Sequence, residues 1–188
     1  HYGGLLELFG LVPVDRLLYD RAPPEVISLA RKAGSELSRV SAGETIEDGD
    51  IHLEMLWPPA DDGNEPASGS GTQTNLRSMV SLFEWRGFRM LLTGDAEAET
   101  VPIHPGPIDV LKVSHHGSED KGLPELLDES SPRLAVISVG ADNRYGHPVP
   151  DVLEELESEG VETIRTDQSG TVSIVLGDGG GFQVETGK

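Results

Sequence analysis

Cysteine is absent from the chain of 188 residues. Its absence excludes a disulfide scaffold and any metal site built from thiolates. A metal ion would therefore have to be bound by His, Asp, Glu or water. The redox compartment stays open, because a domain without cysteine can occur in any compartment.

Long apolar stretches are absent as well. No hydrophobic run approaches the roughly 20 residues that a helix needs to cross a bilayer. The N-terminus lacks the charged region followed by an apolar one that marks a secretory signal. The chain begins at His1 rather than at methionine, and we expect it to be an excerpt from a longer protein.

Basic residues are few, and lysine occurs only at positions 32, 112, 121 and 188. The 33 acidic and 14 basic residues give a formal net charge of −19. This charge argues against electrostatic attraction of the whole surface to DNA or to anionic lipid. An acidic, lysine-poor composition is also one mark of proteins from high-salt environments, where screening weakens the repulsion of a polyanion.

The first part of the sequence predicts short helices and a hairpin. We expect an amphipathic helix over 5–11, a helix over 23–34 and a β-hairpin within 37–57. Proline, glycine, serine and aspartate dominate residues 58–74. This composition indicates either a mobile surface loop or a flap beside a site.

The second part predicts strands joined first by a turn and then by helices. The expected strands are 79–85, 88–95, 108–114, 133–139 and 162–166, the helices 123–130 and 149–159, and the final hairpin 171–176 with 182–186. Hairpins followed by helical crossovers indicate a mixed sheet that is covered by helices.

Polar residues suited to metal binding follow three of these strands. LLTGD ends on Asp95, VLKVSHHG contains His115 and His116, and AVISVGADNRYGHP continues to Asn143 and His147. If these strand ends lie together, they form a site of oxygen and nitrogen ligands suited to Zn or Mn. His1, which precedes YGG, is a further candidate ligand.

A purely structural interpretation is open for each of these residues. Asp95 could cap the segment after its strand, and the His115–His116 pair could simply end a strand. His147 could belong to a turn before a helix that begins near Pro150. We expect His52 on a strand face and His104 on a loop, with no part in a site. Spacing alone therefore suggests a metal site and implies no reaction.

The candidate residues nevertheless suit metal-assisted phosphate chemistry. A carboxylate between two cations reduces their repulsion, and two ions can activate water and neutralise charge on a phosphate. A histidine of the 115–116 pair that is not a ligand could act as a general acid. Lys112 should share a strand face with Ser114 and could meet a phosphate, or it could be a surface lysine.

The chain resembles the metallo-β-lactamase-fold domain of ComEC-type DNA-uptake proteins. The resemblance rests on five motifs in order: HYGGL (1–5), NLRSMV (75–80), LLTGD (91–95), DVLKVSHHGS (109–118) and NRYGHP (143–148). It implies an α+β fold, an αββα sandwich with a metal site at one edge of its two sheets. We expect residues 1–188 to form a single domain that lacks the N-terminal part of this fold, because His1 alone matches the family signature H-x-H-x-D-H.

The same resemblance implies roles for individual residues. Asp95 matches the aspartate that commonly bridges two metals, and His147 lies where the last ligand of the superfamily falls. The implied metal ligands, for one or two Zn or Mn ions, are His1, Asp95, His115 and His147. The implied catalytic residues are His115, His116 and Asp95. The implied substrate-binding residues are Asn75, Ser78, Lys112 and Asn143.

A metal-dependent phosphodiesterase that acts on single-stranded DNA during uptake is the function that the resemblance implies. The domain would accompany a membrane-channel domain of the same or a partner chain, at the extracytoplasmic face. Two alternatives stay open: an esterase or lactonase, which the net charge of −19 favours, and a non-catalytic module. We expect this segment alone to bind metal weakly, to be inactive and to expose a sheet edge.

Overall fold

Residues 3–60 and 75–187 are described by the structure, which is a computed structural model. The chain divides into two compact units, residues 1–41 and 42–188. The prediction of one domain over 1–188 stays a prediction. Within the described residues, no helix is long and apolar enough to cross a membrane.

Two helices and a small parallel sheet make up the first unit. Its elements are α1 (Gly3–Leu11), β1 (Arg16–Tyr19), α2 (Pro24–Ala33) and β2 (Glu36–Arg39). Proline starts α2, and Gly34 ends it with φ 84°, a left-handed conformation that glycine adopts without strain. Both predicted helices are confirmed. Strand β1 was not predicted, and β2 pairs with it in parallel rather than joining a hairpin.

The second unit is built on a seven-stranded mixed sheet with the strand order β3-β4-β5-β6-β7-β8-β9. The strands are β3 (Thr45–Asp48), β4 (Ile51–Trp57), β5 (Val80–Trp85), β6 (Phe88–Leu92), β7 (Val110–Lys112), β8 (Leu134–Ile137) and β9 (Glu162–Arg165). Strands β3 to β6 are antiparallel, and β6 to β9 are parallel. The predicted mixed sheet is confirmed, and the predicted hairpin within 37–57 is β3–β4.

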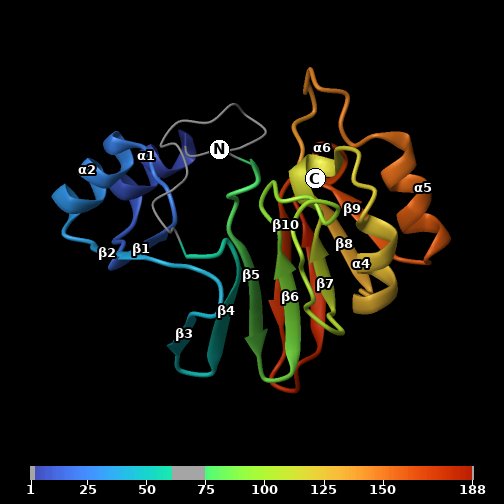
Figure 1. The fold of residues 1–188 in the computed structure, drawn as a ribbon, viewed down its shortest axis with the longest axis horizontal. Coiled ribbons are helices and arrows are strands. Elements are labelled where there is room, and N and C mark those ends of the chain that lie inside the picture. The colour runs from blue at the N-terminus through green and yellow to red at the C-terminus, as the bar shows by residue number, and fades with distance from the viewer. Residues whose placement is uncertain (1–2, 61–74, 188) are drawn as a thin grey trace. The chain divides into compact units, whose positions relative to one another are not determined.

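Helices cover one face of this sheet. Helix α4 (Leu123–Ser130) joins β7 to β8, and α5 (Pro150–Ser158) joins β8 to β9, so two of the three parallel connections are helical (Figure 1). Their buried side chains Leu127 and Leu156 share a core with Leu111 of β7. The two helices lie within the predicted ranges 123–130 and 149–159.

A two-stranded sheet covers the opposite face. Helix α6 (Thr166–Ser169) leads from β9 into the antiparallel pair β10 (Val172–Leu176) and β11 (Phe182–Thr186). Val110, next to Leu111 on β7, packs in this second core with Phe182. Neighbouring strand residues thus face different cores, which explains why Val110 and Leu111 of β7 are both apolar. The described part of the second unit therefore supplies helix, sheet and sheet layers of the α+β fold.

Gly122 is packed against the loop between β6 and β7, and this contact generates a test. A Cβ at position 122 would overlap the backbone of Ala98 and Glu99, and the Cα of Glu99 would lie 2.8 Å away. We expect Gly122→Ala to lower the free energy of unfolding by about 1–3 kcal/mol through overpacking, measured by urea unfolding. Gly140→Ala is the matched control, because nothing lies within 4 Å of its Cβ position. Equal stability of the two variants would contradict this account.

Candidate active site

Strand direction brings the predicted site segments to one edge of the large sheet. Because β6, β7 and β8 are parallel, their carboxyl ends share an edge, and the antiparallel β5 begins there. The segments at this edge are Asn75–Ser78 before β5, Asp95 after β6, His115–His116 after β7 and Asn143–His147 after β8. His1 lies outside the described residues.

Two hydrogen bonds join the ends of β6 and β7. The Thr93 hydroxyl donates to the Lys112 carbonyl at 2.7 Å, and the His115 amide donates to the Gly94 carbonyl at 3.1 Å. These bonds set Asp95 beside the histidine pair. The His116 Nε2 lies 3.9 Å from the Asp95 Oδ1, and the Asp95 side chain is only 12% exposed.

A left-handed turn presents the two histidines. The chain leaves β7 at Lys112, so the predicted strand 108–114 is too long by two residues at each end. In the turn Ser114–Gly117, His115 has φ 42° and His116 has φ 58°. Such conformations cost free energy for residues with a Cβ and are concentrated at functional sites.

Glycine at position 117 allows the loop after β8 to approach this turn. A Cβ on Gly117 would lie 2.6 Å from the Cβ of Pro148. The Gly117 carbonyl accepts a hydrogen bond from the Val149 amide at 2.9 Å. This close approach is what sets His147 next to the His115–His116 pair: the ring centroids of His115 and His147 are 5.8 Å apart.

His115 is oriented by a carboxylate and a hydroxyl. Its Nδ1–H faces the Glu97 Oε1 at 2.7 Å and the Ser118 Oγ at 3.1 Å, while the Ser118 hydroxyl donates to the same Glu97 oxygen at 2.6 Å. With the proton on Nδ1, the Nε2 of the neutral ring is an acceptor. The Asn75 amide nitrogen lies 3.3 Å from this Nε2 and can donate to it.

His116 has the same tautomer for a different reason. Its Nδ1 lies 2.6 Å from the Ser138 carbonyl oxygen, which can only accept a hydrogen bond. The Nε2 that faces Asp95 therefore carries the lone pair of the neutral ring. A histidine whose Nδ1–H is held by a carboxylate or a carbonyl is the usual state of a metal-binding imidazole.

His147 is partly buried, and one of its ring nitrogens is enclosed. Its Nδ1 is buried and has no hydrogen-bond partner among the described residues. Burial, and then the charges of His115 and His116, lower the pKa of His147 below 6.5. The neutral form, which is the form that can bind a cation, is therefore favoured.

Asn143 closes the loop that carries His147. Its side-chain nitrogen donates to the carbonyls of Gly140 and His147, and its Oδ1 accepts from the His147 amide.

Lys112 donates from Nζ to the Val113 carbonyl at 2.7 Å. Burial lowers the pKa of Lys112, and the charge of Asp95 partly opposes this shift. Ser78 lies against Gly94: a Cβ added to Gly94 would be 3.1 Å from the Cβ of Ser78. The substrate-binding roles of these side chains stay predictions.

Three residues of the site were missed by the sequence analysis: Glu97, Ser118 and Asp120. Asp120 is 8% exposed and accepts hydrogen bonds from the amides of Ala98, Glu99 and Gly122 and from the Ser114 hydroxyl. It thereby fixes the loop after β6 to the turn after β7. The sequence could have indicated these residues only by their positions, since all three lie within five residues of Asp95 or His115.

The donor chemistry of the cluster fits a divalent cation. His115, His116, His147 and Asp95 offer imidazole nitrogens and a carboxylate, which suit Zn or Mn, and the His147 Nδ1 lacks another use among the described residues. In the described ranges 3–60 and 75–187, however, no three His, Asp or Glu side chains are arranged closely enough to hold an ion.

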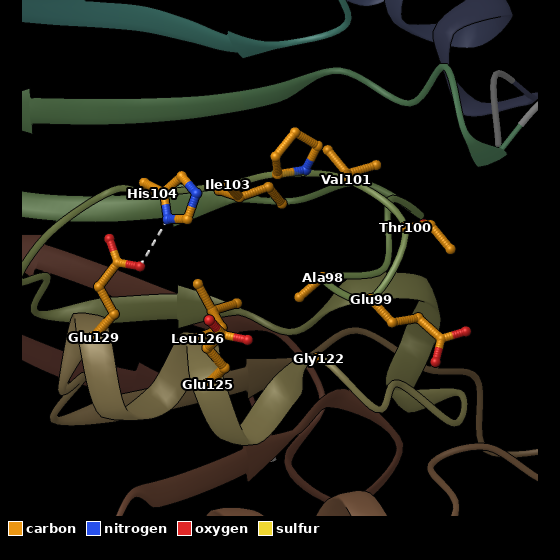
Figure 2. A pocket seen from close by; sticks show the side chains of 11 residues that line it. Ala98, Glu99, Thr100, Val101, Ile103, His104, Gly122, Glu125, Leu126 and Glu129 are labelled. Atoms are coloured by element: carbon orange, nitrogen blue, oxygen red, sulfur yellow. Dashed lines mark hydrogen bonds and ion pairs between the residues drawn. The ribbon is translucent and has the colours of Figure 1, made fainter.

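A separate pocket lies between the loop 98–104 and helix α4, with a volume of about 320 Å³. Figure 2 shows His104 of the loop joined to Glu129 of α4, at 2.9 Å. Neither the histidine pair nor Asp95 lines this pocket. His104 lies on a loop and His52 on β4, as predicted.

No family model matches the chain. It is 36% identical over 153 residues to ComE operon protein 3 of Bacillus subtilis, an alignment of 79% of this chain and 19% of that protein. It is 33% identical over 121 residues to Competence protein ComA of Neisseria gonorrhoeae, covering 61% and 18%. The chain thus spans about a fifth of the length of these curated relatives. The resemblance to ComEC-type proteins is confirmed.

Solved structures with a similar fold include a protein described as a metal-dependent hydrolase from Parabacteroides distasonis. It has a TM-score of 0.52 and 15% identity, over 85% of this chain and 79% of that one. CmlA, a diiron beta-hydroxylase from Streptomyces venezuelae, has a TM-score of 0.54 and 13% identity, over 80% and 38%. At this identity the likeness shows the fold alone, and the predicted metallo-β-lactamase-like fold is confirmed. Their different reactions illustrate that a fold does not fix its chemistry.

The Asp120 network generates one prediction. Asp120→Asn replaces one acceptor oxygen with an NH₂ group that faces other donors. We expect the free energy of unfolding to fall by about 2–3 kcal/mol, measured by urea unfolding. Glu119→Gln makes the same change of charge at a side chain that is 69% exposed, so its stability should match the wild type. A stable Asp120→Asn variant would refute the role of this carboxylate.

The pocket generates a second prediction. The hydrogen bond and charge of Glu129 raise the pKa of His104 above 6.5. This pair stabilises the folded state below about pH 6.5, and its contribution is lost as the pH rises through the raised pKa. Glu129→Gln should lower the pKa of His104 toward the ordinary value, as followed by NMR titration. Glu99→Gln is the control in the same pocket, and an unchanged titration in Glu129→Gln would contradict the pairing.

Proposed function

Because this chain is a homologue of the ComEC-type competence proteins and has a metallo-β-lactamase-like fold, we propose that it is a metal-dependent phosphodiesterase that cleaves single-stranded DNA during uptake. One observation carries the proposal. The Nε2 atoms of two histidines with the same tautomer, the partly buried ring of His147 and the carboxylate of Asp95 gather at one edge of the sheet.

Asp95, His115 and His147, together with His1, would hold the ion or ions. A bound divalent cation supplies an activated water and neutralises charge on the phosphate. Glu97 holds the proton of His115 on Nδ1, which keeps Nε2 directed toward the site. Asn75 donates toward that Nε2 and would be displaced from it when a cation binds.

His116 would serve as the general acid. Its Nδ1–H is held by the Ser138 carbonyl, so Nε2 is the atom at which the ring gains or loses a proton. The Asp95 Oδ1 lies 3.9 Å from this Nε2. The protonated Nε2 would then deliver its proton to the leaving oxygen of the phosphodiester.

Lys112, Ser78 and Asn143 would contribute less directly to substrate binding. Lys112 adds a positive charge near Asp95, Ser78 borders the segment that leads to Asp95, and Asn143 acts through the loop that it closes. The net charge of −19 favours the alternative of a small-ester hydrolase. The homology to competence proteins favours DNA.

The chain would act within a larger protein. It spans 19% and 18% of its two relatives, and we propose that it works beside a membrane-channel domain, at the extracytoplasmic face. The 188-residue chain alone should bind metal weakly and be inactive, because no three His, Asp or Glu side chains of the described residues lie close enough together to hold an ion.

Cleavage of end-labelled single-stranded DNA with Mn²⁺ or Zn²⁺, at low and high salt, tests the function. In the complete protein, Asp95→Asn and His116→Gln should each lower the rate on the order of 10²- to 10⁴-fold. His104→Gln, a change at an exposed ring outside the cluster, should leave it unchanged. The isolated chain, run in parallel, should cleave nothing.

Three outcomes would contradict these proposals. Faster hydrolysis of small esters than of DNA by the wild type would favour the esterase or lactonase. Substoichiometric metal in the purified complete protein, measured by mass spectrometry, would favour the non-catalytic module. Full turnover by the isolated chain would overturn its predicted inactivity.

A further inference from the structure

Tyr145 is an aromatic side chain held in solvent beside the candidate site. It lies in the loop between β8 and α5, and 84% of its surface is exposed. The other exposed large hydrophobic residues of the second unit are Ile51, Met79 and Val175, at 36%, 37% and 44%. Single exposed apolar residues are ordinary, so the position of Tyr145 must carry the argument.

The ring of Tyr145 stacks on His147, at the solvent-exposed side of the histidine cluster. It is parallel to the His147 ring, with an interplanar angle of 9° and a centroid distance of 6.1 Å. The His147 ring is in turn 5.8 Å from that of His115. A flat ligand stacked on the outer face of Tyr145 would therefore lie next to the edge where the candidate catalytic residues gather.

The loop that carries Tyr145 is fixed at its base. Asn143 makes hydrogen bonds to the backbone of both Gly140 and His147. Pro148 is buried against Gly117. The aromatic ring is thus presented by a loop with a defined conformation, which lowers the entropic cost of binding a ligand on it.

The charges around Tyr145 select for a flat, uncharged group. Its exposed neighbours in the sequence, Asp142 and Arg144, carry opposite charges, and the whole chain has a net charge of −19. A phosphate alone would gain little here. A nucleobase presents a neutral aromatic face, and stacking of bases on aromatic side chains is a general means of binding single strands without sequence preference.

We propose that Tyr145 stacks on an unpaired base and holds the adjoining phosphodiester at the Asp95–His115–His116 edge. This inference rests on the proposed function and names the side chain that contacts an unpaired base of its single-stranded substrate. Paired bases inside a duplex offer no free face to the ring, so a duplex would not gain from the contact.

Binding of a labelled oligothymidylate to the complete protein in EDTA, followed by fluorescence anisotropy, tests this inference without cleavage. Tyr145→Ala should raise the Kd about 5- to 150-fold, the range that base stacking supports. Tyr145→Phe, which keeps the ring, should bind like the wild type. With an abasic strand, the three proteins should bind equally.

Salt dependence separates stacking from charge. Tyr145→Ala should leave the slope of log K against log salt unchanged, because a neutral ring releases no counterions. Thermal unfolding checks that Tyr145→Ala is folded, as the exposure of the side chain predicts.

The outcomes distinguish this inference from the proposed function. Wild-type binding by Tyr145→Ala, or equal weakening on the abasic strand, would overturn the stacking role and leave the nuclease standing. A wild-type protein that neither binds nor cleaves single-stranded DNA would overturn both.

Discussion

The change from antiparallel to parallel pairing at β6 is the constraint on which the site depends. A turn of two residues, Arg86-Gly87, joins β5 to β6. A loop over 93–109 leads from β6 to β7 and a helical connection leads from β7 to β8, and the three strands β6, β7 and β8 start at the same end. Parallel strands place their carboxyl ends together. Residues about fifty positions apart in the sequence, such as Asp95 and His147, thereby reach one edge of the sheet.

Buried polar contacts balance the cost of the turn that carries the histidines. Two consecutive residues with a Cβ in left-handed conformations are unfavourable by about 1–3 kcal/mol each. The carboxylate of Asp120 binds the loop after β6 through two amides and the turn through the Ser114 hydroxyl. Hydrogen bonds to a charged acceptor are roughly twice as strong as neutral ones. The same network thus fixes the ring positions and offsets the strain of the backbone that presents them.

The strands could be predicted from the sequence because apolar runs such as LAVI (134–137) are followed by polar residues. Their ends could not, since 108–114 was predicted for a strand that spans 110–112. The turn itself could not, because Ser114 to Gly117 reads as the end of a strand until the conformations of His115 and His116 are known. Glu97 and Asp120 were missed because the chain has 33 acidic residues, and a single sequence does not show which of them are buried. Strand β1 was missed since it is four residues long and its partner is twenty positions away, beyond a helix.

The acidity of the chain bears on how such a site would accept a polyanion. The side chains at this edge include three histidine rings and one carboxylate that a bound cation would compensate, those of His115, His116, His147 and Asp95. Tyr145 extends this surface with a ring that neither attracts nor repels a phosphate. Screening at high salt removes the long-range repulsion of the remaining surface and leaves stacking almost untouched. A single strand can therefore be held at this edge by contacts that do not oppose the net charge of −19.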